Sequence, residues 1–320
     1  MRHRLFLVLP LLSGALFGSV GVFVRKLYEF GMDNSTILTS RIFAAAFILL
    51  VGLWIYDKTL LKIRWPDLWL FAGTGILGML ALNLCYNESI QRLTLSFAAV
   101  LLSMAPIFVM ILAAIFFKEK ITLYKTGLIF LALLGCFLAS GILDDLGQIR
   151  WSAAGVLFGL GSAFFYALYS IFSKKAMERK YNVYTVIFYS LLMALIILLP
   201  LADWGKLASF VAAAPAENSA FLLLHALCTS VLPYLLYTAA LNRVDTSIAA
   251  ILASSGEPAA ALLFGVAFFS EMPTVIAASG VLIVIVAIAL IFRPDRRNTW
   301  PGSKLARLGR NLSGSWRNRQ

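Results

Sequence analysis

The chain of 320 residues is too apolar for a soluble protein. Hydrophobic residues make up 61% of it, charged residues only 13%, and its mean hydropathy is +0.88, whereas a typical soluble domain is about half apolar and a quarter charged. The formal net charge of +12 does not indicate a nucleic-acid partner, because the basic residues gather in short segments between apolar runs. The composition therefore excludes a soluble fold and predicts an integral membrane protein.

Ten apolar stretches are each long enough to cross a bilayer as a helix. They cover residues 5–24, 35–55, 67–87, 95–117, 122–142, 152–173, 183–201, 219–240, 246–269 and 273–292. The first imitates a secretory signal peptide, but its apolar run continues to Val24 and nine further spans follow, so we expect it to stay uncleaved. The connections are short, and the longest, residues 202–218, is Pro-containing and polar. No soluble domain is expected in a loop.

Lys and Arg are distributed unevenly between the two sides of these spans. With a cytoplasmic N-terminus, 21 of them lie on the cytoplasmic side and five on the other. The positive-inside rule therefore places both termini in the cytoplasm, in an inner or plasma membrane. Residues 294–320 form a basic tail that we expect to be disordered and to favour the anionic cytoplasmic leaflet.

The chain contains an internal repeat. Residues 86–103 align with residues 237–254 at a constant offset of 151, with seven identities in 18 positions. With one residue of slippage, Pro106 aligns with Pro258 and Glu119 with Glu271. Repeats of this kind are common in transporters.

The repeat divides the chain into residues 1–143 and 144–293, with five spans each. Because five is odd, the second half must enter the membrane from the opposite side. The expected fold is an all-α membrane protein of ten transmembrane helices, arranged as two inverted five-helix repeats. Such repeats place a site near the midplane and alternate access by rocking against each other.

A few residues in fixed order connect the chain to a known family. They are Arg41 in the second span, Pro106 and Glu119 at the fourth, and Glu257 with Pro258 in the ninth. With them, residues 5–292 resemble the drug/metabolite transporter superfamily, specifically its ten-span EamA-type exporters. The resemblance implies export of a small metabolite or amino acid through a central cavity lined by helices 1, 3, 4, 6, 8 and 9.

Glu257 is the strongest candidate for a functional charge inside a span. Burying a charge at the centre of a membrane helix costs roughly 2.5–3.5 kcal/mol, and Glu257 lies near mid-depth, since eleven residues separate it from Thr246. Pro258 lacks a donor, so we expect the helix to loosen there and free carbonyl groups for a ligand. Glu257 is a candidate for solute binding and proton transfer. The alternative is a structural carboxylate, for instance one paired with Arg41.

Polar and aromatic side chains in other spans supply further candidates, each with a structural alternative. We expect Arg41 to orient or pair with a neighbouring helix, with its head near the interface. Asn83 and Asn87 are four residues apart and share a helix face, where they can hold a polar or zwitterionic solute or bond a neighbouring helix. His225 is a candidate proton acceptor, and structural burial is its alternative. The tyrosines can stack on a solute or pack in the core.

The complete set of candidates is as follows. For the cavity they are Phe17, Asn83, Tyr86, Asn87, Ser103, Tyr166, Tyr169, Tyr234, Tyr237, Ser254 and Glu257; for proton coupling, Glu257 and His225; and for structure or gating, Arg41, Pro106, Pro233 and Pro258.

Other classes of function fit less well. The two histidines, His3 and His225, leave no HExxH motif or metal cluster, and the sequence has no phosphate-binding GxxxxGK[ST] loop. We therefore expect neither an enzyme nor a protein with a cofactor or metal. The alternatives to a secondary transporter are a channel or facilitator and a membrane receptor. An intramembrane serine hydrolase that uses His225 with a serine such as Ser230 is the alternative that fits least well. The expected partners are a small-molecule substrate and the lipid bilayer, with no nucleic acid, in a monomer or dimer.

Overall fold

The ten predicted spans are present as helices in the computed structural model, which describes residues 2–143, 152–270 and 273–292. Within these ranges nine helices are long and apolar enough to cross a membrane. The tenth, Leu123–Ala139, is apolar but has only 17 residues. The part of the chain described here contains no β-strand. The basic tail lies outside it.

The spans are made of the following elements. The first half contains α1 (Arg2–Gly18), α2 (Val20–Glu29), α3 (Asn34–Tyr56), η1 (Lys58–Leu61), η2 (Trp65–Asp67), α4 (Leu68–Ala72), the π-helix η3 (Gly73–Ala81), α5 (Leu82–Arg92), α6 (Leu95–Ser103), α7 (Ala105–Phe117) and α8 (Leu123–Ala139). The second contains α9 (Ala153–Glu178), α10 (Val183–Leu198), η5 (Leu199–Leu201), α11 (Trp204–Ala213), α12 (Pro215–Ala226), the π-helix η6 (Leu227–Val231), α13 (Leu232–Leu241), α14 (Thr246–Phe269) and α15 (Val275–Phe292).

Short polar side chains define where several spans begin. The carboxylate of Asp33 accepts the backbone N–H groups of Ser35 and Thr36 at the start of α3. Thr122 caps α8 and Asn182 caps α10 in the same way. Such caps satisfy N–H groups that have no partner within the helix.

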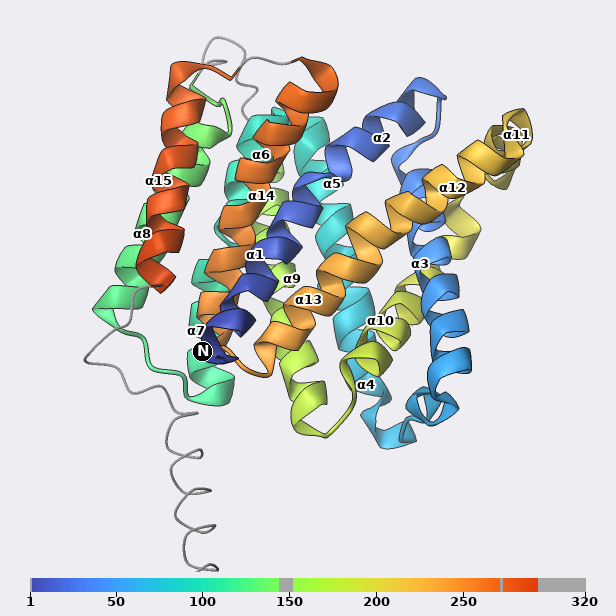
Figure 1. Ribbon diagram of the computed structural model, residues 1–320, viewed down its shortest axis with the longest axis horizontal. Coiled ribbons are helices and arrows are strands. Elements are labelled where there is room, and N and C mark those ends of the chain that lie inside the picture. Colours follow the sequence, from blue (N-terminus) through green and yellow to red (C-terminus); the bar gives the residue numbers. More distant parts are fainter. Residues whose placement is uncertain (1, 144–151, 271–272, 293–320) are drawn as a thin grey trace, which may run out of the picture.

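The two halves of the chain are interleaved. Helix α1 packs mainly against α14 and α13, whereas α9 packs against α5, η3 and α7. Helix α3 lies beside α10, and α8 beside α15, as Figure 1 shows. The first span of each repeat therefore belongs, in packing terms, to the other repeat. α1 begins and α15 ends on the same side of the bundle (Figure 1), as an even number of spans requires.

Local backbone features recur in both repeats. Helices α7 and α14 each end in a left-handed residue, Lys118 and Ser270, both with φ of 54°. They are 152 positions apart, the offset that aligns Pro106 with Pro258. The π-helices η3 and η6 occupy equivalent places in spans 3 and 8. This confirms the inverted five-helix repeat.

Helices α1 and α14 approach each other closely because of two glycines. A Cβ atom at Gly14 would overlap the carbonyl oxygen of Ala253, and one at Gly18 would lie 2.6 Å from that of Glu257. Only glycine permits this spacing, so the GxxxG pattern of α1 holds the backbone of Glu257 against the first span.

Two backbone features differ from the simplest interpretation of the sequence. The connection at residues 202–218, described above only as Pro-containing and polar, contains the short helix α11, capped by the carboxylate of Asp203, which accepts the N–H of Lys206. Helix α14 also continues through Pro258. The break lies instead in the first repeat, where α6 ends at Ser103 and α7 begins at Ala105, just before Pro106.

Candidate solute-binding cavity

A cavity of about 790 Å³ lies between the helices of the two repeats. Its wall is formed by residues of α1, α2, α3, α5, α6, α7, α8, α9, α13, α14 and α15 and of the π-helix η3. All eleven cavity candidates lie in this wall: Phe17, Asn83, Tyr86, Asn87, Ser103, Tyr166, Tyr169, Tyr234, Tyr237, Ser254 and Glu257. The volume falls within the range of small-molecule sites, roughly 300–1,000 Å³.

The cavity reaches one end of the bundle. Its wall includes Tyr28 near the end of α2, Asn34 at the start of α3, Leu95 at the start of α6 and Ser140 after α8. These residues flank the connections opposite the N-terminus. The mouth of the cavity therefore lies on the side of the bundle opposite the start of α1 and the end of α15.

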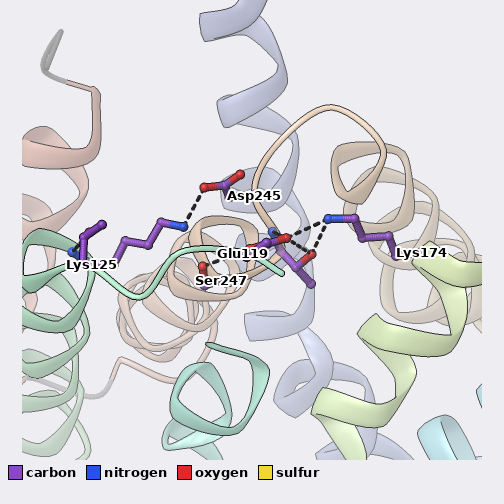
Figure 2. A network of polar contacts seen from close by, with 7 residues as sticks. Glu119, Lys125, Lys174, Asp245 and Ser247 are labelled. Atoms are coloured by element: carbon purple, nitrogen blue, oxygen red, sulfur yellow. Dashed lines mark hydrogen bonds and ion pairs between the residues drawn. The ribbon is translucent and has the colours of Figure 1, made fainter. Parts of the chain in front are cut away.

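The opposite end is closed by a polar network around Glu119 (Figure 2). The Nζ atom of Lys174 donates to Oε1 of Glu119 at 2.7 Å and to the hydroxyl of Thr246 at 2.8 Å. Glu119 Oε1 also accepts the backbone N–H and the hydroxyl of Thr246, at 3.0 and 2.7 Å. Glu119 thus caps α14 while it joins α7 to α9.

The charge of Glu119 is stabilised by these contacts. Partial burial by itself would raise the pKa of the carboxyl, but the charge of Lys174 and the hydrogen bonds from Lys174 and Thr246 outweigh it and hold the pKa below its ordinary value. Nearby, Lys125 Nζ lies 2.6 Å from Asp245 Oδ2, as Figure 2 shows. Both contacts cross from the first repeat to the second.

A second ionic cluster lies on the same side of the protein. Asp67 is buried, and its carboxylate accepts hydrogen bonds from Arg64 at 2.9 Å, from Tyr181 at 2.8 Å and from Arg179. It joins the connection before α4 to the end of α9. The loops that the positive-inside rule assigns to one side of the membrane thus contact one another.

Tyrosines of α9 and α13 form one wall of the cavity. The hydroxyl of Tyr169 lies 2.8 Å from that of Thr238, and the hydroxyl of Tyr237 lies 2.7 Å from that of Ser170. The rings of Tyr169 and Tyr234 pack at 5.0 Å. These bonds fix the hydroxyl ends and leave an aromatic surface toward the cavity.

Arg41 lies in the cavity wall. Its head was expected near the membrane interface, and this expectation was wrong. Only 9% of its surface is exposed. Nη2 donates to Oδ1 of Asn83 at 3.3 Å, and Asn83 in turn donates to the carbonyl of Met79 at 2.7 Å. The pairing between helices is present, but its partner is a neutral amide. The buried Nε has no hydrogen-bond acceptor among the described residues.

Glu257 also lines the cavity. Its carboxylate forms no hydrogen bond or ion pair, with Arg41 or with any other residue that the structure describes. Helix α14 is continuous at Pro258, and the expected loosening is limited to one backbone hydrogen bond that is not formed. Pro258 has no N–H for the carbonyl of Ser254, and that carbonyl accepts a weak hydrogen bond from Sγ of Cys136 at 3.6 Å.

His225 stands apart from the cavity. It is fully buried and stacks on Phe23, with ring centroids 5.1 Å apart. Neither ring nitrogen has a hydrogen-bond partner within the described ranges.

Two of the proline candidates have structural roles. Pro106 lies in the first turn of α7, and the carbonyl of Pro233 accepts a hydrogen bond from Ser13 at 2.8 Å.

Some residues of the site were not predicted. Cys136 lines the cavity but was not among the candidates. Lys174 was not singled out among the basic residues. A signal for it existed in the repeat, because an offset of 149 aligns Arg25 and Lys26 with Lys174 and Lys175. Arg25 lines the mouth of the cavity, whereas Lys174 lies at the closed end.

Comparison with known proteins agrees with this architecture. The model of the EamA-like transporter family matches residues 4–141 and 153–293, one match for each repeat. The pseudopaline exporter CntI of Pseudomonas aeruginosa is 30% identical over 68% of this chain and 72% of its own. An uncharacterized transporter of Archaeoglobus fulgidus is 27% identical over 88% and 94%, and one of Haemophilus influenzae is 25% identical over 74% and 76%.

A solved structure has the same fold. It superposes with a TM-score of 0.70 over 89% of this chain and 96% of its own, at 13% sequence identity. The residues that match the family model include every helix that forms the cavity. The chain therefore belongs to the EamA-like transporter family, and it is a membrane transporter rather than an enzyme.

Proposed function

We propose that this protein is a secondary transporter that exports a small solute, an amino acid or a similar metabolite, by alternating access. The observation that carries the proposal is the asymmetry of the cavity. It reaches one end of the bundle, while the other end is closed by Glu119, Lys174 and Thr246. A structure of this kind is one of the two states that alternating access requires, with the solute site open to one side only.

The orientation follows from charge. We propose that the closed end faces the cytoplasm of an inner or plasma membrane, because the Lys- and Arg-rich connections lie there. The cavity then opens to the outside, as expected of an exporter that has released its solute. The name of the Pseudomonas relative, which is an exporter, supports this direction.

We further propose that Glu257 exchanges a proton during the cycle. It is a carboxylate in the cavity wall without a partner among the described residues, so its charge can be neutralised by a proton or by a solute. Replacing it by Gln removes the titratable group and keeps the shape. The Glu257→Gln variant should transport with a flattened pH dependence in proteoliposomes, and an unchanged pH dependence would refute the proton role.

Labelling from both sides of the membrane tests the mechanism without knowledge of the solute. The three native cysteines are replaced by alanine, and Ser103 in the cavity wall is replaced by cysteine. An impermeant maleimide should label this cysteine mainly from the outside. Glu119→Gln in the same background should increase labelling from the cytoplasmic side.

Flux distinguishes a transporter from a channel. Proteoliposomes loaded with unlabelled solute should accumulate labelled solute transiently by counterflow, and the rate should saturate. Flux that never saturates and shows no exchange would contradict the proposal and favour a channel. Equal labelling of Ser103→Cys from both sides, with Glu119 intact, would also favour a channel.

A further inference from the structure

The cavity contains two opposite charges that do not neutralise each other. Arg41 enters its wall from α3, and Glu257 enters from α14. No ion pair joins them. Unpaired charges inside a membrane protein are costly and are kept where they meet an ion or a ligand. The chemistry of the missing partner can be derived from the surroundings of each charge.

Arg41 is suited to bind an anion. Its guanidinium has five N–H donors, and its one hydrogen-bond partner in the described structure is the neutral amide of Asn83. Nε is buried without an acceptor. A planar carboxylate is the acceptor whose geometry matches two adjacent guanidinium N–H groups. The side chain of Arg41 therefore fits a monovalent, planar anion such as a carboxylate.

Glu257 is suited to bind a cation. The tyrosines Tyr86, Tyr166 and Tyr234 lie close enough to interact electrostatically with its carboxylate, and all three line the cavity. Aromatic faces and a carboxylate together stabilise an ammonium group, which otherwise loses its hydration on entry.

Tyr234 relates the two sites. Its hydroxyl interacts electrostatically with both Arg41 and Glu257, and its ring packs against those of Phe17, at 5.2 Å, and Tyr169, at 5.0 Å. The anion site, the cation site and Tyr234 therefore lie in the wall of one cavity.

We infer that the cavity binds a zwitterion, with the carboxylate of the solute at Arg41, its ammonium at Glu257, and its apolar part against the tyrosines of α9 and α13. Such a solute has no net charge, and it matches a pair of sites whose charges also cancel. A cation or an anion alone would pair only one of the two charges and leave the other as it is in the unliganded protein, so it gains one charge-assisted contact where a zwitterion gains two. The inference rests on the proposed function, since it specifies the solute of the same cavity.

Matched ligands test the inference. Purified protein is first screened with the twenty common L-amino acids by thermal stabilisation, and the tightest-binding zwitterion is compared with its decarboxylated amine and its deaminated acid. The wild type should bind the zwitterion at least tenfold more tightly than either analogue.

Variants then assign each charge. Arg41→Gln should weaken binding of the zwitterion about tenfold or more and should leave binding of the amine unchanged, whereas Glu257→Gln should weaken the zwitterion and leave the acid unchanged. Arg41→Lys keeps the charge and should restore part of the affinity. Arg92→Gln and Glu88→Gln are matched controls, because this exposed pair lies outside the cavity, and both should bind the zwitterion as the wild type does.

Three results would overturn the inference: no stabilisation by any zwitterion, equal binding of the amine or the acid, or variants that keep the melting transition of the folded protein and yet lose affinity for all three ligands equally. A variant without that transition is misfolded, and Arg41→Lys then serves as the test at that position. If Ser103→Cys is labelled mainly from the outside, and from the cytoplasmic side only after Glu119→Gln, while zwitterions fail to bind, the transport proposal stands and only the solute class is wrong.

Discussion

The ammonium of Lys174 lies 2.7 Å from the carboxylate of Glu119. This ion pair connects the end of α7 to α9, and the hydrogen bonds of both side chains to Thr246 connect them to the start of α14. Both side chains are largely buried, with 18% and 10% of their surfaces exposed. In the proposed alternating-access cycle these contacts would have to break before the cavity could open at this end, so we expect the network to contribute to the relative stability of the two proposed states.

Loss of the charge of Glu119 should shift the protein toward the state open at this end. Glu119→Gln removes an ion pair and weakens the cap of α14, with a loss of about 1–3 kcal/mol, or roughly a fivefold to hundredfold change in the ratio of states. Labelling of Ser103→Cys from the cytoplasmic side measures this shift. Glu88→Gln, at an exposed pair with Arg92, is the control and should leave labelling unchanged.

Acid should act on the same network. The pKa of Glu119 in this state is lower than the ordinary carboxyl value of about 4.3, so its stabilising contribution is complete above that value and is lost as the pH falls through the lowered pKa. The ratio of cytoplasmic to outside labelling of Ser103→Cys should therefore rise in strongly acidic buffer and stay flat near neutral pH. The ratio is used because the maleimide reacts with the thiolate, so labelling from both sides slows in acid. The rise should be absent in Glu119→Gln; an identical rise in that variant would assign it to another group.

Asp67 should be important for stability rather than transport. Its carboxylate is 2% exposed and binds Arg64, Arg179 and Tyr181, so Asp67→Asn leaves two cations with a weaker partner. Because the arginines are partly exposed, we expect a modest loss of about 1–3 kcal/mol, seen as a lower melting temperature in detergent. Glu178→Gln breaks an exposed pair with Lys175 and should change it little.

A methyl group at Gly14 should disturb the contact between α1 and α14. In Gly14→Ala the new Cβ would overlap the carbonyl oxygen of Ala253, and a backbone atom cannot move aside. Overpacking of this kind costs about 1–3 kcal/mol. Gly52→Ala is the matched control, since a Cβ there meets nothing within 4 Å, and it should be neutral or stabilising. Equal melting temperatures of the two variants would refute the packing argument.

Much of the candidate site was predicted from sequence because the signal was local or repeated. A charge or an amide in an apolar run is conspicuous, and this alone identified Glu257 and Asn83. The repeat then extended the set from Tyr86 to Tyr237. Candidates without such support did less well, and His225, chosen only for its chemistry, packs against Phe23 away from the cavity.

Backbone features that depend on contacts between distant segments, or that carry mixed local signals, were not predicted from the sequence. Helix α11 carries signals that favour a helix, a capping Asp203 and an apolar Leu207 and Phe210 on one face, but the stretch was described from the sequence only as a Pro-containing, polar connection. At Pro258 the sequence rule predicted a loosened helix. In the structure α14 continues through Pro258, and the thiol of Cys136, which is distant in sequence, donates a weak hydrogen bond to the carbonyl of Ser254 that Pro258 cannot bond.

The sequence by itself determined the number of spans and the inverted repeat. Lipid requires each span to be apolar over its whole length and to bond its own backbone, so these properties are written along the chain. Only the tertiary structure decided that the first span of each repeat packs into the other, that one end of the cavity is closed by Glu119 and Lys174, and that Arg41 and Glu257 share a cavity without pairing. These are contacts between distant segments, and their geometry depends on side chains of several helices at once.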